Sequence, residues 1–346
     1  MKKPLISVHF LIGSTIPNLF RILKNGRFRL SYLGFLKVLT LLLVLLFFVP
    51  LTILDALFYH RKVKKVKLNN EPIFIIGHAR SGTTYMHNLI TRDEQFIYSS
   101  TYQCLMPNSF LSGGKGLEKL LSALIPNKRP MDNVLMGADL PQEDEFGVNA
   151  ISGYSYFQAL CFPKSTKKFF NEYALLNTGQ AENWKRIYYF FLQKISFHNP
   201  QAQIVSKNPI NTVRISVLLE MFPKAKFIYM ARDKEEVLNS SFNLYNTLSG
   251  MYSFHNISEE ELIYNMLWVY DKTIETYNAQ KHLIPSENLI EVNYADLISD
   301  PHTHVKKIYE ELGLSDFHNQ QESLNQYIEL QKSFQVNTKT FYRPKS

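Results

Sequence analysis

The stretch PIFIIGHARSGTTYMHNLI, residues 72–90, decides the fold class of this 346-residue chain. It begins with a short run of β-branched and aromatic residues that ends at Gly77, which is typical of a buried strand. A helix with Ser81 as a possible N-cap is expected to follow. Gly77 and Gly82 stand where the two glycines of the phosphate-binding pattern G-x-x-x-x-G-K-[ST] stand, but Thr83 replaces the lysine. The stretch therefore predicts a strand–loop–helix phosphate site in which the cation is not a lysine after the second glycine but Arg80, inside the loop.

The donors of this loop indicate what it can bind. A glycine-rich turn into a helix offers several backbone N–H groups and the positive end of the helix to a phosphate. Ser81, Thr83 and Thr84 add hydroxyl donors, and Arg80, the nearest cation, can bind two oxygens at once. In lysine-containing loops the lysine reaches the β- and γ-phosphates while a Ser or Thr holds Mg²⁺. The altered loop favours a ligand with one phosphate here over a triphosphate with its metal; a tight turn without a ligand is the alternative.

A second anion site is predicted in KFIYMARDKEEVLNSSFNL, residues 226–244. Arg232 ends an expected strand, and Ser240 lies eight residues later inside the expected helix. A strand-end arginine and a helix serine can hold a second phosphate between them. The alternative is that Arg232 pairs with Asp233 or with a helix end and that Ser240 is an ordinary helix residue.

Strands and helices alternate along the rest of the chain. Repeated strand–helix units predict a parallel sheet covered on both faces, with ligands at the carboxyl ends of its strands. Residues 101–153 contain clusters such as SGGKG and are expected to be rich in loops. The further expected strands are 201–208, 224–232 and 288–294, and the helices after them end near Met221, Leu248 and Leu312, the last before Gly313. The predicted fold class is α/β, a P-loop-like parallel sheet flanked by helices and preceded by an N-terminal membrane-associated helical segment.

With both anion sites in place, the chain resembles the sulfotransferases that use 3′-phosphoadenosine 5′-phosphosulfate (PAPS). Within them it is most similar to bacterial membrane-associated sulfotransferases with an apolar N-terminal segment. The resemblance covers roughly residues 72–301 and includes TYQC, RPMDN, LPQEDEF and SKNPINTVRI. Two positions depart from the family pattern: Lys234 stands where proline is usual, and Ala295 stands where an acidic residue is usual. Neither position belongs to the cofactor residues.

The resemblance implies a reaction and a set of cofactor residues. The implied reaction moves a sulfuryl group from PAPS to a hydroxyl and gives a sulfate ester and 3′,5′-ADP. No metal ion is expected, because a sulfuryl group carries less charge than a phosphoryl group. A P-loop-type nucleotide or small-molecule kinase is the rival enzyme class, and it would need a lysine after Gly82. The residues implied to bind the 5′-phosphosulfate are Arg80, Ser81, Gly82, Thr83 and Thr84, and those implied to bind the 3′-phosphate are Arg232 and Ser240.

Cations that could stabilise the leaving phosphate occur in and after the second expected strand. Lys207, in VSKNP, ends that strand and is the candidate for the bridging oxygen, as the lysine of this motif is in the family. A surface lysine at a strand end is the alternative. Arg80 is expected to share the role, and Arg214 in the next helix either reaches the cofactor or is solvated.

The general base is sought in DLPQEDEF, residues 139–146, which lies where related enzymes place their base. Glu143 is the first choice, followed by Asp144 and then Glu145; a solvated acidic turn is the alternative. Burial against the adjacent phenylalanine would raise a carboxyl pKa toward the working range. Two histidines are rivals: His78 could act as base or phosphate donor, and His87, a turn inside the helix, fits a structural role better.

The N-terminal part of the chain is apolar and basic. Residues 1–70 carry 12 Lys and Arg and one acid, Asp55, a net charge of +11, and the remaining 26 basic and 29 acidic residues give −3. Because residues 71–346 are slightly acidic, a nucleic-acid partner is not expected. The basic residues that flank the apolar N-terminal run are instead expected to contact anionic lipid headgroups. The uncharged run Val38–Leu54, extended to 38–59, predicts a membrane segment rather than a buried soluble helix. Pro50 is expected to kink it, and the basic residues at both ends leave open whether it spans or re-enters. The predicted division is 1–68, membrane-associated, and 69–346, the sulfotransferase domain.

Compartment and acceptor follow from weaker signals. Two cysteines, Cys104 and Cys161, favour a reducing compartment and neither a disulfide framework nor a zinc site. The expected location is a membrane with the catalytic domain on the cytoplasmic face of a bacterium, or the Golgi lumen if the source is eukaryotic. Aromatic loops beside a membrane segment favour a lipid-like acceptor (a lipid, quinone or sterol) over a carbohydrate or other small molecule. A basic C-terminal tail that contains Lys339, Arg343 and Lys345 either closes over the cofactor or stays untethered.

Overall fold

The computed structural model describes residues 9–129, 134–177, 179–315 and 317–332. The chain forms two compact units. Of the described residues, the first contains those within 9–66, 100–194 and 244–265, and the second contains those within 67–99, 195–243 and 266–332. The helices α11 (Lys234–Tyr252) and α12 (Glu259–Gln280) each continue from one unit into the other. The division of the chain at residues 68 and 69 stays a prediction.

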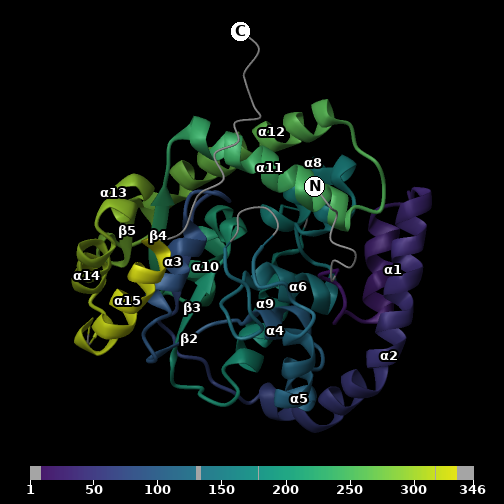
Figure 1. The fold of residues 1–346 in the computed structure, drawn as a ribbon, viewed down its shortest axis with the longest axis horizontal. Coiled ribbons are helices and arrows are strands. Elements are labelled where there is room, and N and C mark those ends of the chain that lie inside the picture. Colours follow the sequence, from purple (N-terminus) through teal and green to yellow (C-terminus); the bar gives the residue numbers. More distant parts are fainter. Residues whose placement is uncertain (1–8, 130–133, 178, 316, 333–346) are drawn as a thin grey trace. The chain divides into compact units, whose positions relative to one another are not determined.

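The second unit is built on a parallel sheet of five strands in the order β2-β3-β1-β4-β5 (Figure 1). All neighbouring strands are parallel, and the first strand, β1, is central. The sequence therefore predicted the fold class correctly. The strands are β1 (Ile73–Ile76), β2 (Phe96–Ile97), β3 (Gln203–Lys207), β4 (Lys226–Ala231) and β5 (Leu289–Asn293).

Both faces of this sheet are covered, as its continuous apolar strands require. Ile73 and Ile75 of β1 point into a buried cluster with Met86 and Leu89 of α3. Phe74, between them, points to the other face, where its ring packs on Phe222. The helices of this unit are α3 (Thr83–Ile90), α10 (Ile215–Met221), α13 (Tyr294–Ser299), α14 (Pro301–Glu311) and α15 (Phe317–Lys332), with 3-10 turns at Pro209–Val213, Lys281–Leu283 and Ser286–Asn288.

The first unit is helical among its described residues, including the region that the sequence analysis assigned to loops. Residues 101–153 contain α4, α5 and α6, so that prediction was wrong for these helices, while the described residues between α5 and α6 form a loop as expected. A capping box between Ser100 and Gln103 starts α4, and the SGGKG cluster makes only a kink at Gly114 inside α5. Residues 130–133 of the PNKRPMDN cluster lie outside the described residues. The helices are α1 (Ile16–Asn25), α2 (Tyr32–Val63), α4 (Thr101–Leu105), α5 (Phe110–Ser122), α6 (Asp144–Ser152), α7 (Gln158–Cys161), α8 (Thr166–Phe169) and α9 (Ala181–Ile195), with a 3-10 turn at Pro163–Ser165 and a π-helical turn at Phe170–Ala174.

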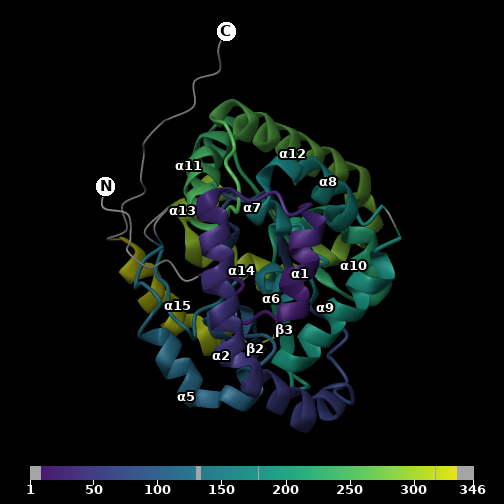
Figure 2. The ribbon, with the colours of Figure 1, turned by 90° about the vertical axis from the view of Figure 1, so that its right-hand side faces the viewer.

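The predicted apolar segment is one helix, α2, of 32 residues. It begins after Ser31, whose side chain accepts the N–H of Gly34, and it continues through Pro50. By length and composition it could cross a membrane. It runs beside α1 within the first unit (Figure 2).

Candidate active site

Two glycines shape the loop between β1 and α3. Gly77 has a φ of 132° and Gly82 a φ of 97°, values that glycine adopts without steric cost. A Cβ at Gly77 would lie 2.7 Å from the Met230 carbonyl oxygen, and one at Gly82 would collide with the Tyr294 ring. The Gly77 N–H donates to Thr212 Oγ1 (2.8 Å), and the Thr212 hydroxyl donates back to the Gly77 carbonyl (3.1 Å). The loop is thus held in one shape at the start of α3.

Arg80 connects this loop to the second predicted anion site. Its guanidinium Nε donates to the Ser240 hydroxyl on α11 (2.8 Å). Its carbonyl accepts a hydrogen bond from Nη1 of Arg232, which directly follows β4 (3.0 Å). Three of the residues predicted to bind the cofactor, from three separate elements, therefore meet at the carboxyl edge of the sheet.

Arg232 has an internal counter-charge in this arrangement. Its Nε donates to the Glu236 carboxylate at 2.8 Å, and its guanidinium lies over the Tyr294 ring, 4.4 Å from the ring centre. Asp233, considered above as its partner, instead accepts the backbone N–H of Glu236 and caps α11. The Glu236 side chain is exposed, so a ligand can displace it from Arg232.

The N-cap of α3 is Gly82, so the prediction of Ser81 as the cap was wrong. Ser81 is buried, and both its hydroxyl and its backbone N–H donate to the His78 carbonyl (2.8 and 3.1 Å). The helix proper starts at Thr83, which is buried, followed by the half-buried Thr84. The first N–H groups of a helix have no acceptor within it, and here they belong to the residues predicted to face a phosphate.

Lys207 and Arg214 are both buried. Lys207 ends β3 as predicted and is in register with Ile75 of β1, next to the start of the loop. Its side chain is 1 % exposed, which rules out the alternative of a surface lysine. Arg214 is also 1 % exposed, and its Nη1 donates to the side chain of Asn211 (3.3 Å), so the alternative of a solvated arginine is wrong as well.

Neither histidine beside the loop carries charge near neutral pH. Burial lowers the pKa of His78 to about 4, although its hydrogen bond to the Ala79 carbonyl (2.7 Å) acts in the opposite direction. Because a carbonyl can only accept, the His78 proton is on Nδ1. Burial also lowers the pKa of His87 well below its ordinary value, and the nearby Lys207 charge adds to this. The cations of this unit's site are therefore arginine and lysine side chains.

The acidic stretch lies in the first unit, at the start of α6. Asp144 and Glu145 are buried, which excludes a solvated acidic turn. The Asp144 carboxylate accepts the Tyr188 hydroxyl (2.8 Å), and Glu145 accepts the Ser155 hydroxyl (2.7 Å). Glu143 stands at the N-cap position and stays partly exposed. Asp144 and Glu145 therefore attach α6 to Tyr188 and Ser155. Glu143 differs from these two acids because it is partly exposed.

Two tyrosines escaped the sequence analysis. Tyr294, just after β5, touches the position of Gly82 and lies under Arg232, so it supports both halves of the predicted cofactor site. An aromatic residue at the carboxyl end of a strand was the available signal. Tyr245 is a neighbour of Glu143: burial raises its pKa, a hydrogen bond with Tyr156 opposes this, and the Glu143 charge adds to it. No sequence pattern predicts that Tyr245, Tyr156 and Glu143 lie close together.

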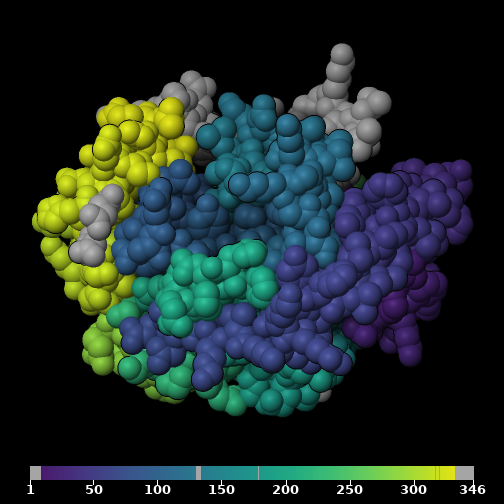
Figure 3. Space-filling view, turned by 90° about the horizontal axis from the view of Figure 1, so that it is seen from below, coloured from purple at the N-terminus to yellow at the C-terminus, as the bar shows by residue number. Residues whose placement is uncertain are grey.

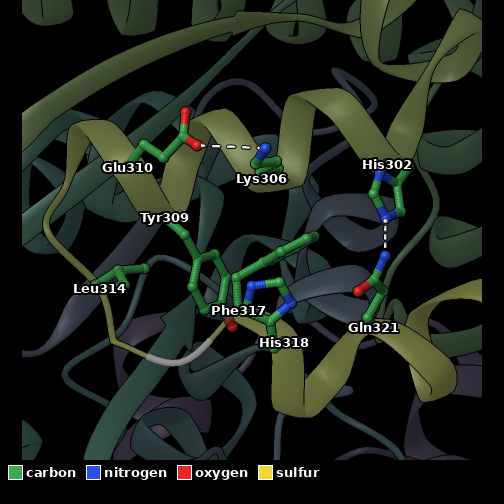
Figure 4. Close-up of a pocket in the computed structure, with 8 residues that line it drawn as sticks. All are labelled: His302, Lys306, Tyr309, Glu310, Leu314, Phe317, His318 and Gln321. Carbon is green, nitrogen blue, oxygen red and sulfur yellow. Dashed lines mark hydrogen bonds and ion pairs between the residues drawn. The ribbon is translucent and has the colours of Figure 1, made fainter.

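A cavity of about 270 Å³ in the second unit lies away from this cluster, between α14 and α15 (Figure 4). Its polar side chains already interact with one another: Lys306 pairs with Glu310 (3.7 Å), and His302 with Gln321 (3.3 Å). None of the predicted cofactor residues lines it. In the part of the chain that the structure describes, no three His, Cys, Asp or Glu side chains are grouped as metal ligands, and both cysteines are buried free thiols.

Comparison with known proteins identifies the family of this chain. The sequence model of the Sulfotransferase family matches residues 72–319, from β1 into α15. The chain belongs to the sulfotransferase family. This sulfotransferase is 31% identical over 284 residues to the omega-hydroxy-beta-dihydromenaquinone-9 sulfotransferase Stf3 of Mycobacterium bovis and to that of Mycobacterium tuberculosis. Each match covers 81% of this chain and 72% of the relative.

Solved structures agree on the fold. Sulfotransferase STF9 from Mycobacterium avium superimposes with a TM-score of 0.64 at 20% identity, covering 78% of this chain and 70% of that one. Sulfotransferase STF1 from Mycobacterium tuberculosis H37Rv gives a TM-score of 0.59 at 20% identity, covering 90% of this chain and 85% of that one. The predictions of an enzyme, of the family and of the fold are thereby confirmed.

Proposed function

We propose that this sulfotransferase moves the sulfuryl group of PAPS to a hydroxyl of a lipid-like acceptor and releases 3′,5′-ADP. The observation that carries the donor is the meeting of Arg80, Ser240 and Arg232 at the start of α3. The acceptor class is supported by the mycobacterial relatives, whose name gives a hydroxylated menaquinone derivative as their substrate. A quinone was one of the three lipid-like classes predicted, besides lipids and sterols.

The residues present fit this donor. The two glycines let the turn pack closely against Met230 and Tyr294, and the helix start behind it supplies N–H groups for the 5′-phosphosulfate. Arg80, Thr83 and Thr84 border that point. Arg232 and Ser240 would hold the 3′-phosphate, with Glu236 displaced from Arg232. Because Arg80 already contacts Ser240, one side chain can interact with both phosphate groups. Ser81 contributes through the shape of the loop, since its hydroxyl is used internally.

Transfer to a hydroxyl requires a base for the acceptor proton and positive charge at the leaving oxygen. Lys207 and Arg80 are proposed to supply that charge, and Lys207 is pre-organised by burial at the end of β3. Glu143 is proposed as the base because, unlike the adjacent Asp144 and Glu145, it is partly exposed. Asp144 is the second choice, since its carboxylate already accepts the Tyr188 hydroxyl. No metal ion is proposed to take part.

The enzyme is further proposed to act at a membrane, with its catalytic face in the cytoplasm of a bacterium. The support is the apolar helix α2 and the excess of positive charge in residues 1–70. A lipid-like acceptor would be available there, and bacterial PAPS is made in the cytosol. The basic C-terminal residues Lys339, Arg343 and Lys345 lie outside the described residues.

The test is transfer from radiolabelled PAPS into a host lipid extract by membrane-bound protein. Wild type, Lys207→Ala and Arg80→Ala are compared, each with and without EDTA and with ATP as a competing donor. We expect label in an organic-soluble product, a loss of about 10²–10³-fold in Lys207→Ala, as for removal of one charge-stabilising group, and no effect of EDTA.

Each other outcome has a defined meaning. Label only in water-soluble products would replace the lipid-like acceptor with a carbohydrate or other small molecule. Loss of turnover in EDTA, or use of ATP, would favour the kinase. Tight binding of 3′,5′-ADP with full activity in Lys207→Ala would remove that lysine from the reaction.

A further inference from the structure

The helix α2 has two faces of different character. Its buried positions are Gly34, Leu41, Leu45, Phe48, Asp55 and Val63. They recur at intervals of 7, 4, 3, 7 and 8 residues and so form one stripe along the helix. Most other positions between residues 38 and 58 are apolar and partly or fully exposed, with Phe47 at 72% and Leu57 at 70%. The purple to indigo atoms of the N-terminal helices are exposed on the face shown in Figure 3.

The buried stripe is bound to the first unit near both ends of α2. At the start, the Ser31 N–H donates to the Phe254 carbonyl (2.9 Å), and a Cβ at Gly34 would collide with the same carbonyl. Lys37 Nζ then donates to the carbonyls of Gly250 and Ser253, both at 3.0 Å. The start of the helix is therefore in backbone contact with the rest of its unit.

At the other end, Asp55 turns inward. Its carboxylate pairs with Lys194 Nζ (2.6 Å) and accepts the backbone N–H groups of Leu111 and Ser112 (3.1 and 3.3 Å). Lys194 also donates to the Pro107 carbonyl (2.7 Å). The only acid of the segment is thus satisfied inside the protein and never faces lipid.

The distance between these attachments excludes a crossing. Gly34 and Asp55 are 21 residues apart, about 32 Å along a helix, and the hydrocarbon core of a bilayer is about 30 Å thick. Both attachments are made to the same folded unit. A spanning α2 would therefore pull the irregular backbone around Phe254, or the charged side chain of Lys194, into the bilayer. Lipid-exposed irregular backbone does not occur there, and a charge at that depth is costly.

Charge identifies what covers the exposed face. Arg27 and Arg29 before the helix and Arg61, Lys62 and Lys65 at its end are exposed. Anionic lipid headgroups attract such residues by about 1 kcal/mol each. A second copy of the chain fits poorly, because both ends of α2 are basic. Pairing two such helices, parallel or antiparallel, would bring like charges together.

We propose that α2 docks lengthwise into one leaflet of an anionic bilayer and does not cross it. Its exposed apolar face enters the acyl region, and the basic residues at its two ends contact headgroups on the same side. Amphipathic interfacial helices bind in this way, at a depth of about 5–10 Å. In α2 the face turned away from the bilayer is covered by the rest of the first unit and does not face water. This rests on the membrane association proposed above and specifies its geometry: both ends of α2 stay in the cytoplasm.

The first experiment locates the two ends of α2 in the full chain in bacterial membranes. Arg29→Cys and Lys65→Cys are treated separately with a membrane-impermeant maleimide, in inverted vesicles and in spheroplasts. The wild type, whose Cys104 and Cys161 are buried, serves as the background control. We expect both variants to be labelled in inverted vesicles and neither in spheroplasts. Labelling of one end from each side would overturn the proposal.

The second experiment measures flotation of the purified full chain with preformed vesicles of phosphatidylcholine, with or without phosphatidylglycerol. Phe47→Glu should reduce vesicle binding by about tenfold or more, because a charge then enters the apolar region. Leu283→Glu, at an exposed apolar residue outside the N-terminal helices, is the matched control and should bind normally. Phosphatidylglycerol should strengthen binding.

Two results of flotation would contradict the proposal. Unchanged binding in Phe47→Glu would be one. The other would be a wild type that does not bind vesicles but self-associates in solution, with the self-association lost in Phe47→Glu. The exposed face of α2 would then join two copies of the chain. Retained 3′,5′-ADP binding in Phe47→Glu keeps this test separate from that of the proposed function. A docked protein without sulfuryl transfer would refute the reaction and leave the docking intact.

Discussion

Two charged clusters of this protein differ in how their charges are satisfied. In the first unit, Asp55 and Lys194 are both buried and bind each other and backbone groups. In the second unit, Arg80 and Arg232 stay half-buried, and Arg232 pairs with the exposed carboxylate of Glu236. The buried Asp55–Lys194 pair, with its fixed partners, holds the chain together. A half-buried arginine whose partner is an exposed carboxylate, such as Arg232 with Glu236, is suited to bind a ligand. Mutations in the first cluster should therefore affect stability, and mutations in the second should affect ligand binding.

The largest effect is expected at the buried pair. Asp55→Ala leaves the Lys194 ammonium buried without its counter-charge and should lower the free energy of unfolding by about 3–5 kcal/mol. Chemical denaturation of the detergent-solubilised protein measures this. The double variant Asp55→Leu with Lys194→Met removes both charges and should recover most of the loss. An unchanged unfolding midpoint in Asp55→Ala would show that the pair does not hold α2. The folded fraction should still bind 3′,5′-ADP.

Acid should destabilise the second unit through a histidine that contributes no charge to its site. The pKa of His78 is about 4 when folded and 6.5 in its ordinary state. Between these values the unfolded chain binds more protons, so the free energy of unfolding falls as the pH drops from about 6.5 to 4. The full shift corresponds to about 3 kcal/mol. In His78→Asn, whose amide can donate to the Ala79 carbonyl, the dependence of the urea midpoint on pH should be weaker. An identical pH dependence in both proteins would contradict this.

The sequence predicted the second unit much better than the first. Buried parallel strands read as continuous apolar runs, and the glycine positions, Arg80 and Arg232 follow directly from strand ends that meet at one edge. The partners of those residues could not be predicted in the same way. Thr212 and Tyr294 reach the loop through tertiary packing across 135 residues and 212 residues of chain, and no local pattern encodes such contacts.

The first unit was predicted less well because its turn signals, such as glycine clusters, are ambiguous. Glycine clusters usually mark loops, yet Gly114 makes only a kink inside α5. The apolar run of α2 indicated a membrane, but not that Asp55 turns inward toward Lys194, which lies 139 residues further on. Solvated acids and buried acids also look alike in a sequence, and Tyr188 and Ser155, which bind Asp144 and Glu145, are not adjacent to them.

At the half-buried cluster, the effect should fall on binding instead of on stability. Arg232→Ala is expected to weaken 3′,5′-ADP binding by about 10- to 100-fold, the loss of a charged hydrogen bond worth about 1.5–3 kcal/mol. The unfolding midpoint should stay the same. Lys234→Ala removes an exposed cation two residues away, paired with Asp271, and is the matched control. Isothermal titration compares the three proteins, and equal affinity of Arg232→Ala and wild type would eliminate the second anion site.

The smallest effect tests whether Glu236 is displaced. A phosphate that binds Arg232 must compete with this carboxylate, so Glu236→Gln should tighten 3′,5′-ADP binding by about two- to fivefold, in keeping with the small free energy of an exposed ion pair. Glu235→Gln, in the same turn of α11, removes the same charge and serves as control. If both variants tighten binding equally, the cause is the general potential of the helix start. A gain confined to Glu236→Gln means that the unliganded enzyme keeps its 3′-phosphate arginine paired until the donor arrives.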